Sequence, residues 1–456
     1  MPFTRSHAQW AVAIVLSTLL LIAPALWNGF PLLEYDTGGY LARWYEGTLL
    51  INRPLIYGLL LTANVPFAFW PVIIFQSLLT FWILAVTLRT HGYGGRPMLV
   101  LGFISVLSVV STLPFITAIL LTDIYCGLAI LAFYMLLARS DQLTRFECWT
   151  FVLLIACACA SHSATLAVMI LLSAASIVLT LFDRVRLPRV RVAQGVLAVV
   201  LGVVIVLGTN FMLVKRLAWT PGGFSMYFGR MLQAGIVNKY LDKHCPDPAI
   251  KLCAIKDRLP DNADDWFWAN KDFDALGRFA GMSAEMEKVA LGSAADFPLD
   301  VLTSTIEATA AQLVAVRSGE GVVNWIWHTY FIVKDHAPQL QPAMWAARQQ
   351  KGEISFTAIN AVHYPVALIA MAFLPVILIM GWTGRLPRAF GDLAFVCILA
   401  LLANAFVCGG LANPHDRYGA RIVWLAVFIA GLAVLRLYEQ REGAAAPGPT
   451  RDVFAA

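Results

Sequence analysis

The chain alternates between long apolar runs and short polar connectors. An apolar run of about 20 residues is long enough to cross the hydrocarbon core of a bilayer as a helix. Such runs predict ten transmembrane helices, at 9–28, 69–88, 97–116, 119–138, 147–161, 164–182, 193–213, 359–381, 389–410 and 418–436. The pattern therefore predicts an all-α polytopic membrane protein.

Two pairs of these runs are almost continuous. The stretch 97–138 is interrupted at Thr112-Leu113-Pro114, and the stretch 147–182 at Ser161-His162-Ser163. A run of about 40 apolar residues is too long for a single span. Each pair is therefore interpreted as a hairpin that turns at its polar break.

Composition supports a membrane protein. With 59% hydrophobic and 13% charged residues, a chain of 456 residues is too apolar to cover itself with a soluble surface. The net charge of +5 is modest, and the arginines lie in short connectors rather than in one basic stripe. Membrane lipids are expected partners, whereas nucleic acid is not.

Basic residues predict the orientation. If the N-terminus is cytoplasmic, most connector arginines fall on the cytoplasmic side, as the positive-inside rule requires. The opposite short loops then hold only Arg43, Arg53, Arg417 and Arg421. Both termini are expected on the cytoplasmic side of a bacterial inner membrane. The first run could instead be a cleaved signal peptide, but Ala23-Pro-Ala-Leu-Trp27 lacks a convincing small-x-small cleavage site.

The predicted spans divide the chain into four parts. Residues 1–213 form a membrane module of seven helices, whose first outer loop, 29–68, is acidic. Residues 214–358 are polar and mainly helical in pattern, which predicts a periplasmic soluble domain between helices seven and eight. Residues 359–438 form a second membrane module of three helices, and 439–456 a disordered cytoplasmic tail.

Cys245 and Cys253 differ from the other cysteines. Six of the eight cysteines lie in or beside apolar runs, where a thiol behaves as a small apolar residue. Cys245 and Cys253 lie in a polar segment on the predicted outer side, and an oxidising compartment favours a disulfide between them. Zinc binding with His244 is the alternative, although no fourth ligand is spaced to join them.

Two carboxylates, Glu34 and Asp36, follow the first apolar run directly. A carboxylate beside lipid keeps its charge only with donors or a cation nearby, and it can then accept a proton or bind a metal. Asp123, at the predicted outer start of span four, could join them in one site. The alternative for the first two acids is a solvated loop carboxylate or a helix cap, with Asp36 capping a short helix over 37–45. The alternative at the fourth span is capping by Thr122 or Asp123.

The last predicted outer loop is the densest polar segment, Asn413-Pro-His-Asp-Arg-Tyr-Gly-Ala-Arg421. Arg417 and Arg421 are four residues apart and share one helical face. Arginine is suited to bidentate phosphate recognition, and a histidine can also donate to phosphate. The alternative for this loop is that its Arg and Tyr anchor the chain at the membrane interface. The alternative for the histidine at 162 is a purely structural role in a turn. The candidate phosphate-binding residues are Arg417, Arg421, His415, Tyr418, Arg53 and His162.

This arrangement resembles the GT-C superfamily of polyprenyl-phosphate-sugar-dependent glycosyltransferases, and in particular bacterial family 39-like enzymes. Such enzymes have an acidic motif in the first outer loop, often an aspartate at the outer start of the fourth span, and late Arg-Tyr residues. The matching positions are Glu34-Tyr35-Asp36, Thr122-Asp123 and Arg417-Tyr418. The likeness covers most of 1–436. The soluble domain departs from it, since many members carry theirs after the last span, and no Trp-Trp-Asp motif of an oligosaccharyltransferase is present.

The resemblance implies a reaction. A sugar would move from a polyprenyl-phosphate donor to a hydroxyl acceptor on a glycan, a lipid or a protein, at the outer face of the membrane. Asp36 would be the general base, with Glu34 and Asp123 beside it, and the arginines would neutralise the departing lipid phosphate. No cofactor is expected, although the three acids could hold a divalent metal.

Three other classes stay open. A lipid-linked glycan ligase is also an outer-face transferase, but it relies on Arg and His without an early acidic motif. A transporter or flippase needs polar groups through the middle of the bilayer, which these spans almost lack. A non-catalytic subunit could bind a partner through aromatic pairs such as Trp266-Phe-Trp268 and Trp325-Ile-Trp327.

Overall fold

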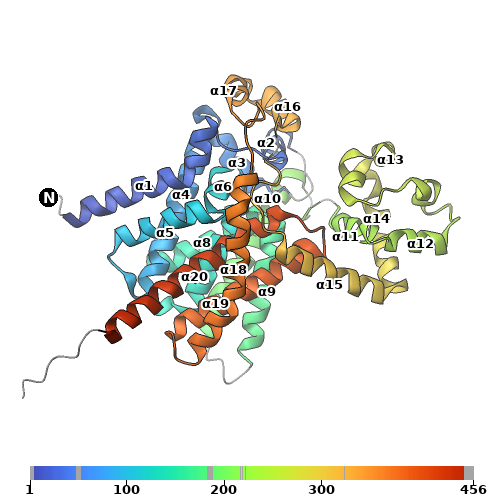
Figure 1. Ribbon diagram of the computed structural model, residues 1–456. Helices are drawn as coiled ribbons and strands as arrows, with labels where there is room; N and C mark the ends of the chain where they lie inside the picture. Colours follow the sequence, from blue (N-terminus) through green and yellow to red (C-terminus); the bar gives the residue numbers. More distant parts are fainter. Residues whose placement is uncertain are drawn as a thin grey trace, which may run out of the picture.

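The computed structural model describes residues 5–47, 53–181, 188–215, 217, 219–220, 222–322 and 324–445. These residues form helices joined by turns and loops, and they contain no strand; Leu32 and Ile119 form an isolated bridge. The predicted all-α class is therefore confirmed for the described part of the chain (Figure 1).

Six of the helical stretches described are long and apolar enough to cross a membrane, as in a multi-pass membrane protein. They coincide with six predicted spans and comprise α1 (Arg5–Asn28), α4 with η2 (Trp70–Leu88 and Arg89–Tyr93), α10 (Arg189–Val214), α18 (Thr357–Trp382), α19 with η7 (Arg388–Ala405 and Phe406–Gly410) and α20 (Asp416–Ala445). The other four predicted spans coincide with the shorter helices α5 (Pro97–Val110), α7 (Asp123–Ala138), α8 (Arg145–Ser161) and α9 (Ser163–Leu179).

Helix α7 lies in the centre of the bundle. It contacts α4, α8, α10, α19 and α20, and every residue from Asp123 to Leu137 is buried. A helix enclosed on all sides needs an apolar surface all round, which explains its run of Leu, Ile, Ala and Phe. Its N-terminal residue, Asp123, is the exception, and the candidate site lies there.

The chain between α5 and α7 is longer and more irregular than the turn predicted at 112–114. Helix α5 ends at Val110, and a short helix, α6 (Leu113–Ala118), occupies the end of the predicted span 97–116. The segment after α6 is extended, so that Leu32 N donates to Ala118 O at 3.0 Å and Leu120 N donates to Leu32 O at 2.9 Å. These bonds hold the loop after α1 beside the start of α7.

The loop after α1 continues into two short helices, α2 (Tyr35–Glu46) and α3 (Leu55–Ala63). The N-cap of α2 is Glu34, whose carboxylate accepts the Asp36 N–H at 2.6 Å while its own N–H donates to Thr37 Oγ1 at 3.1 Å. The predicted capping by Asp36 is therefore wrong. The reciprocal arrangement is a capping box, and it leaves the Asp36 side chain free to turn toward the bundle.

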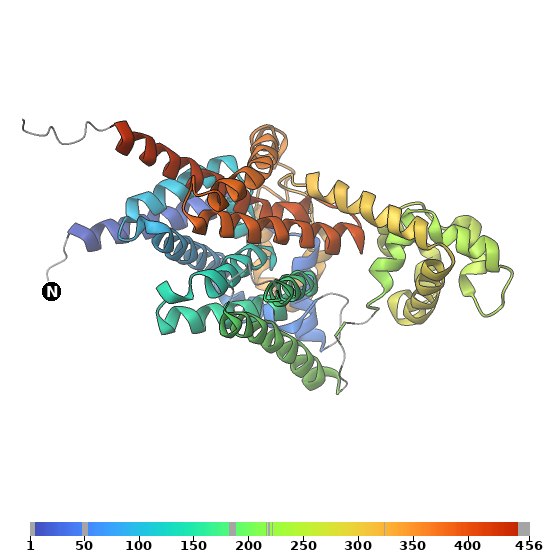
Figure 2. The same ribbon diagram turned by 90° about the horizontal axis from the view of Figure 1, so that it is seen from below.

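Residues of the predicted soluble domain contribute to two separate cores. Helices α11 (Ser225–Gln233), α12 (Ile236–His244), α13 (Lys271–Ala275) and α14 (Arg278–Asp296) surround their own apolar core, which includes Phe228 and Trp266. We call these four helices and their connections, 222–297, the outlying unit. Figures 1 and 2 show it set apart from the bundle, with α15 (Pro298–Val314) running between them. The predicted domain boundaries stay a prediction. The predicted disorder of the tail 439–456 is wrong for 439–445, which continue the last helix of the chain, and 446–456 lie outside the described residues.

The remainder, which we call the covering segment (315–322 and 324–356), packs on the bundle instead. It contains α16 (Trp327–His336) and α17 (Gln341–Ala346), which lie at the same end as α2 (Figure 1). Gln349 accepts from Leu33 N at 3.0 Å and donates to Leu33 O at 2.7 Å. The covering segment therefore holds the loop that carries Glu34.

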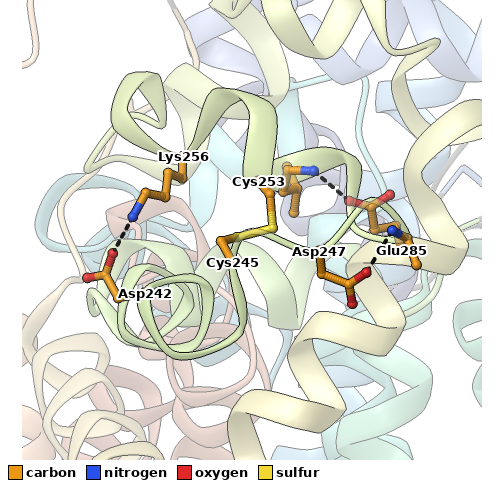
Figure 3. Close-up of a disulfide and its surroundings, with 8 residues drawn as sticks. Asp242, Cys245, Asp247, Cys253, Lys256 and Glu285 are labelled. Atoms are coloured by element: carbon orange, nitrogen blue, oxygen red, sulfur yellow. Dashed lines mark hydrogen bonds and ion pairs between the residues drawn. A yellow bond between two sulfur atoms is a disulfide. The ribbon is translucent and has the colours of Figure 1, made fainter.

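The predicted disulfide between Cys245 and Cys253 is present in the outlying unit (Figure 3). The zinc alternative is wrong, because both sulfur atoms are used in this bond. Around it, Lys256 pairs with Asp242 at 3.0 Å, and Leu252 N donates to Glu285 Oε1 at 2.8 Å. The bond closes a loop at one edge of the unit's core.

Candidate functional site

Three acids from two distant segments meet around one arginine. Arg417, in the first turn of α20, donates from Nη1 to Glu34 at 2.8 Å and to Asp36 at 3.0 Å. Its Nε donates to Asp123 at 3.1 Å. The four side chains are between 5% and 18% exposed. We call Glu34, Asp36, Asp123 and Arg417 the acidic cluster. Moving such charges out of water is costly, so the contacts between the acids and the arginine must offset this desolvation cost.

Capping does not explain Asp123. Thr122, which precedes α7, has a helical backbone and makes no side-chain capping bond, and Asp123 turns to Arg417 instead. The predicted capping of this helix by Thr122 or Asp123 is therefore wrong. The Thr122 hydroxyl instead contacts the Tyr40 hydroxyl at 3.3 Å, which ties the start of α7 to α2.

A second arginine reaches Asp36. Arg53 pairs with the Asp36 oxygen that Arg417 does not contact, and its guanidinium lies 5.8 Å from the centre of the Tyr40 ring. Asp36 therefore lies between two cations. It is also the most exposed of the three acids, at 18% against 7% for Glu34 and 5% for Asp123.

The two acids of α2 differ in protonation. Burial raises the pKa of Glu34 to about 7, although Arg417 opposes this shift. Burial acts in the same direction on Asp36, but Arg53 and Arg417 outweigh it and lower the pKa of that carboxyl to about 2. At neutral pH Asp36 is therefore ionised, while Glu34 is partly protonated.

Arg421 is placed differently from Arg417, although both were predicted to bind phosphate. It is fully buried, and it donates from Nε to Asn404 Oδ1 and from Nη1 to His162 Nδ1, each at 3.0 Å. Burial lowers the pKa of His162 to about 3, so this histidine is neutral and accepts from Arg421. Arg421 lies 4.0 Å from Asp123 and thus supports the acidic cluster from within the bundle.

His415 and Tyr418 lie beside Arg417. The His415 ring is 5.5 Å from the Tyr418 ring, which is 5.9 Å from the Arg417 guanidinium. His415 Nδ1 contacts Glu320 Oε1 at 2.8 Å, and its Nε2 is 3.5 Å from Asp264 in the outlying unit. His415 therefore connects the site to the outlying unit through Asp264.

Glu320 is a site residue that sequence reasoning missed. Its second oxygen accepts the Arg417 backbone N–H at 2.7 Å, which anchors the start of α20. Its neighbour Gly321 has φ +81°, and a Cβ there would lie 2.6 Å from the Glu34 carboxylate. The covering segment therefore contacts the cluster closely. The Gly-Glu-Gly sequence could have indicated this site, since glycines occur where the backbone passes close to another group.

Asn404 was also missed. It accepts from Arg421 and donates to Tyr418 O at 2.8 Å. Its signal was a lone amide inside an apolar run, because a polar group in a membrane-spanning helix faces the bundle interior and needs a partner.

The acids do not fit a metal as they are arranged. Among the described residues, no group of three or more His, Cys, Asp or Glu side chains could hold a metal ion. Glu34, Asp36 and Asp123 all contact Arg417, which supplies the positive charge that a cation would bring. A divalent ion would have to displace this guanidinium.

Comparison with protein-family models, curated proteins and solved structures gave no match for this chain. The geometry and chemistry of the site itself therefore indicate what this chain can do.

Proposed function

We propose that this chain is a GT-C-type membrane glycosyltransferase that moves a sugar from a polyprenyl-phosphate donor to a hydroxyl acceptor. In this proposal ten helices cross a bacterial inner membrane, both termini are cytoplasmic, and the acidic cluster and residues 214–358 are periplasmic. The observation that carries the proposal is the contact of Arg417 with three buried acids at one end of the bundle. A base for the acceptor and a cation for the lipid phosphate are thus adjacent.

Donor binding would rearrange the cluster. Arg417 uses Nη1 and Nε on the acids, while its Nη2 makes no hydrogen bond to any residue that the structure describes. A lipid phosphate could bind there and compete with Asp36 for the guanidinium, since charge-assisted bonds from arginine to phosphate are strong. Arg53 is the second cation within reach of the same anion.

The same competition would activate the base. With both arginines on it, Asp36 has a pKa of about 2 and is too weak a base to take a hydroxyl proton. When the phosphate draws Arg417 away, the pKa of Asp36 must rise, because a nearby cation was holding it down. The general base would therefore become effective only when the donor is present.

The chemical step then balances. Asp36 takes the proton of the acceptor hydroxyl as that oxygen forms a bond to the anomeric carbon. The bond from the anomeric carbon to the phosphate oxygen breaks, and the polyprenyl phosphate leaves with the electron pair. The transition state has oxocarbenium character at the sugar. Arg417 and Arg53 stabilise the negative charge that develops on the leaving phosphate.

Asp36 suits the role of base better than Glu34. One Glu34 oxygen accepts the Asp36 N–H at 2.6 Å and the other accepts from Arg417 at 2.8 Å, so both are used in holding the site together. The raised pKa of Glu34 would otherwise favour it. We therefore assign Glu34 to shaping the cluster and Asp36 to proton transfer.

The test uses polyprenyl-phosphate sugars extracted from a strain that lacks the gene as the donor pool. Asp36→Asn should lower release of polyprenyl phosphate by about 100-fold or more, because general base catalysis contributes that much. Glu46→Gln is the matched control, since Glu46 ends the same helix, is 45% exposed and should leave turnover unchanged.

Two outcomes would contradict the proposal. A folded Asp36→Asn protein that retains turnover would favour the ligase alternative, which needs no acid. If deletion of the gene causes no lipid-linked sugar to accumulate, transfer from such a donor is not the reaction.

A further inference from the structure

A pocket lies far from the acidic cluster, between α1, α4 with η2, and α5. Its volume is about 420 Å³, and its inner wall includes Trp10, Phe81 and Trp82. Trp10 is near the start of α1 and Asn28 at its end, which places the pocket about 27 Å along the helix from the loop that carries Glu34. A ligand there cannot take part in chemistry at the cluster.

Two arginines and a tyrosine line one end of this pocket. Arg96 is 58% exposed and Arg89 39% exposed, so both can reach a ligand in the headgroup region. Tyr93 donates to Glu439 at 2.9 Å, which keeps this end of the wall polar. Another lining residue, Leu78 on α4, is 40% exposed, so the apolar part of the pocket opens toward hydrocarbon.

Positive charge exceeds negative charge at this end. Arg89 pairs with Glu147 at 2.8 Å, whereas Arg96 and Arg436 share Glu439 at 3.4 and 3.6 Å. These three arginines face two glutamates, which leaves one cation in excess. The long distance and high exposure of the Arg96 pair mean that it could exchange its carboxylate for another anion at little cost.

We propose that this pocket binds one acyl chain of an anionic phospholipid, with the headgroup phosphate on Arg96 and Arg89. An apolar wall that opens to hydrocarbon beside exposed arginines matches an amphiphile with a negative head. Basic pockets between membrane helices are suited to such lipids, and the volume lies within the roughly 300–1,000 Å³ of typical ligand pockets. The site is independent of the proposed glycosyl transfer.

The test compares two phospholipids with the same palmitoyl and oleoyl chains, phosphatidylglycerol and phosphatidylcholine, by native mass spectrometry of the full-length protein. We expect phosphatidylglycerol to be retained preferentially. Arg96→Gln should weaken that retention by about fivefold, since one arginine near a membrane surface contributes that much to binding an anionic lipid. Ala85→Trp, which places an indole ring in the pocket where the acyl chain would lie, should abolish it.

Arg388→Gln is the matched control. Arg388 is 63% exposed and begins α19, whose Phe390 contacts His91 of η2, so it lies at the same end of the bundle but does not line the pocket. It should retain phosphatidylglycerol like the wild type. Equal binding of both lipids, or an equal loss in Arg388→Gln and Arg96→Gln, would overturn the proposal. Retention by a folded Ala85→Trp protein would also overturn it, since the lipid would then bind elsewhere.

Discussion

The acidic cluster and the outlying unit use charge in opposite ways. In the outlying unit, Lys256 and Asp242 are close in sequence and exposed. In the cluster, Arg417 and Glu34 are 383 residues apart and nearly buried. Exposed pairs contribute little to stability, whereas buried charges pay for desolvation and depend on their partners. The difference predicts that removing one member of the cluster destabilises the protein far more than removing one member of an exposed pair.

The largest effect should come from removing the central cation. Arg417→Met leaves Glu34, Asp36 and Asp123 buried without their shared partner, which should lower the free energy of unfolding by about 3–5 kcal/mol. Denaturant unfolding of the detergent-solubilised protein measures this. Arg258→Gln, which removes an exposed pair of the outlying unit, should leave it unchanged. If both variants lose a similar free energy of unfolding, the buried and exposed charges of the two regions do not differ in their contribution to stability.

The cluster should also make stability depend on pH. Burial raises the pKa of Glu34 from 4.5 to about 7, so between these values the folded protein keeps a proton that the unfolded chain has lost. The free energy of unfolding should therefore fall as the pH rises from about 4.5 to 7, by on the order of 3 kcal/mol. Glu34→Gln should flatten this slope in unfolding curves measured across the window, and Glu46→Gln should keep it.

Loss of the disulfide should affect the outlying unit alone. Cys245 and Cys253 are eight residues apart, and opening so short a loop should cost about 2–3 kcal/mol. In the double serine variant, hydrogen exchange should speed up in α11 to α14 and stay slow in α7. Faster exchange in α7 as well would mean that the two cores unfold together.

The smallest effect is expected for the exposed pair near the disulfide. Lys256→Gln removes the contact with Asp242 and should not change the unfolding curve measurably. Asp123→Asn offers the opposite case, because it leaves Arg417 and Arg421 short of a buried carboxylate. If Lys256→Gln shifts the unfolding curve as much as Asp123→Asn does, burial does not determine how much these ion pairs contribute to stability.

Local pattern alone predicted much of this protein. Long apolar runs predicted the six long helices, because a span depends on continuous hydrophobicity over neighbouring residues. The order of runs and loops predicted that Glu34, Asp36, Asp123 and Arg417 lie on the same side of the membrane and that Asp123 could join the other two acids. The structure shows all three acids in contact with Arg417. Short spacing in a polar segment likewise predicted the bond between Cys245 and Cys253.

Only the tertiary structure decided the partners within the site. Arg417 and Arg421 are equivalent in the sequence pattern, yet one contacts three acids and the other contacts Asn404 and His162. Glu320 anchors Arg417 from the covering segment, which lies almost 100 residues earlier. Spacing can place side chains on one helical face, but which distant group each of them meets depends on how helices pack. Burial then determines how much stability is lost when one partner of such a contact is removed.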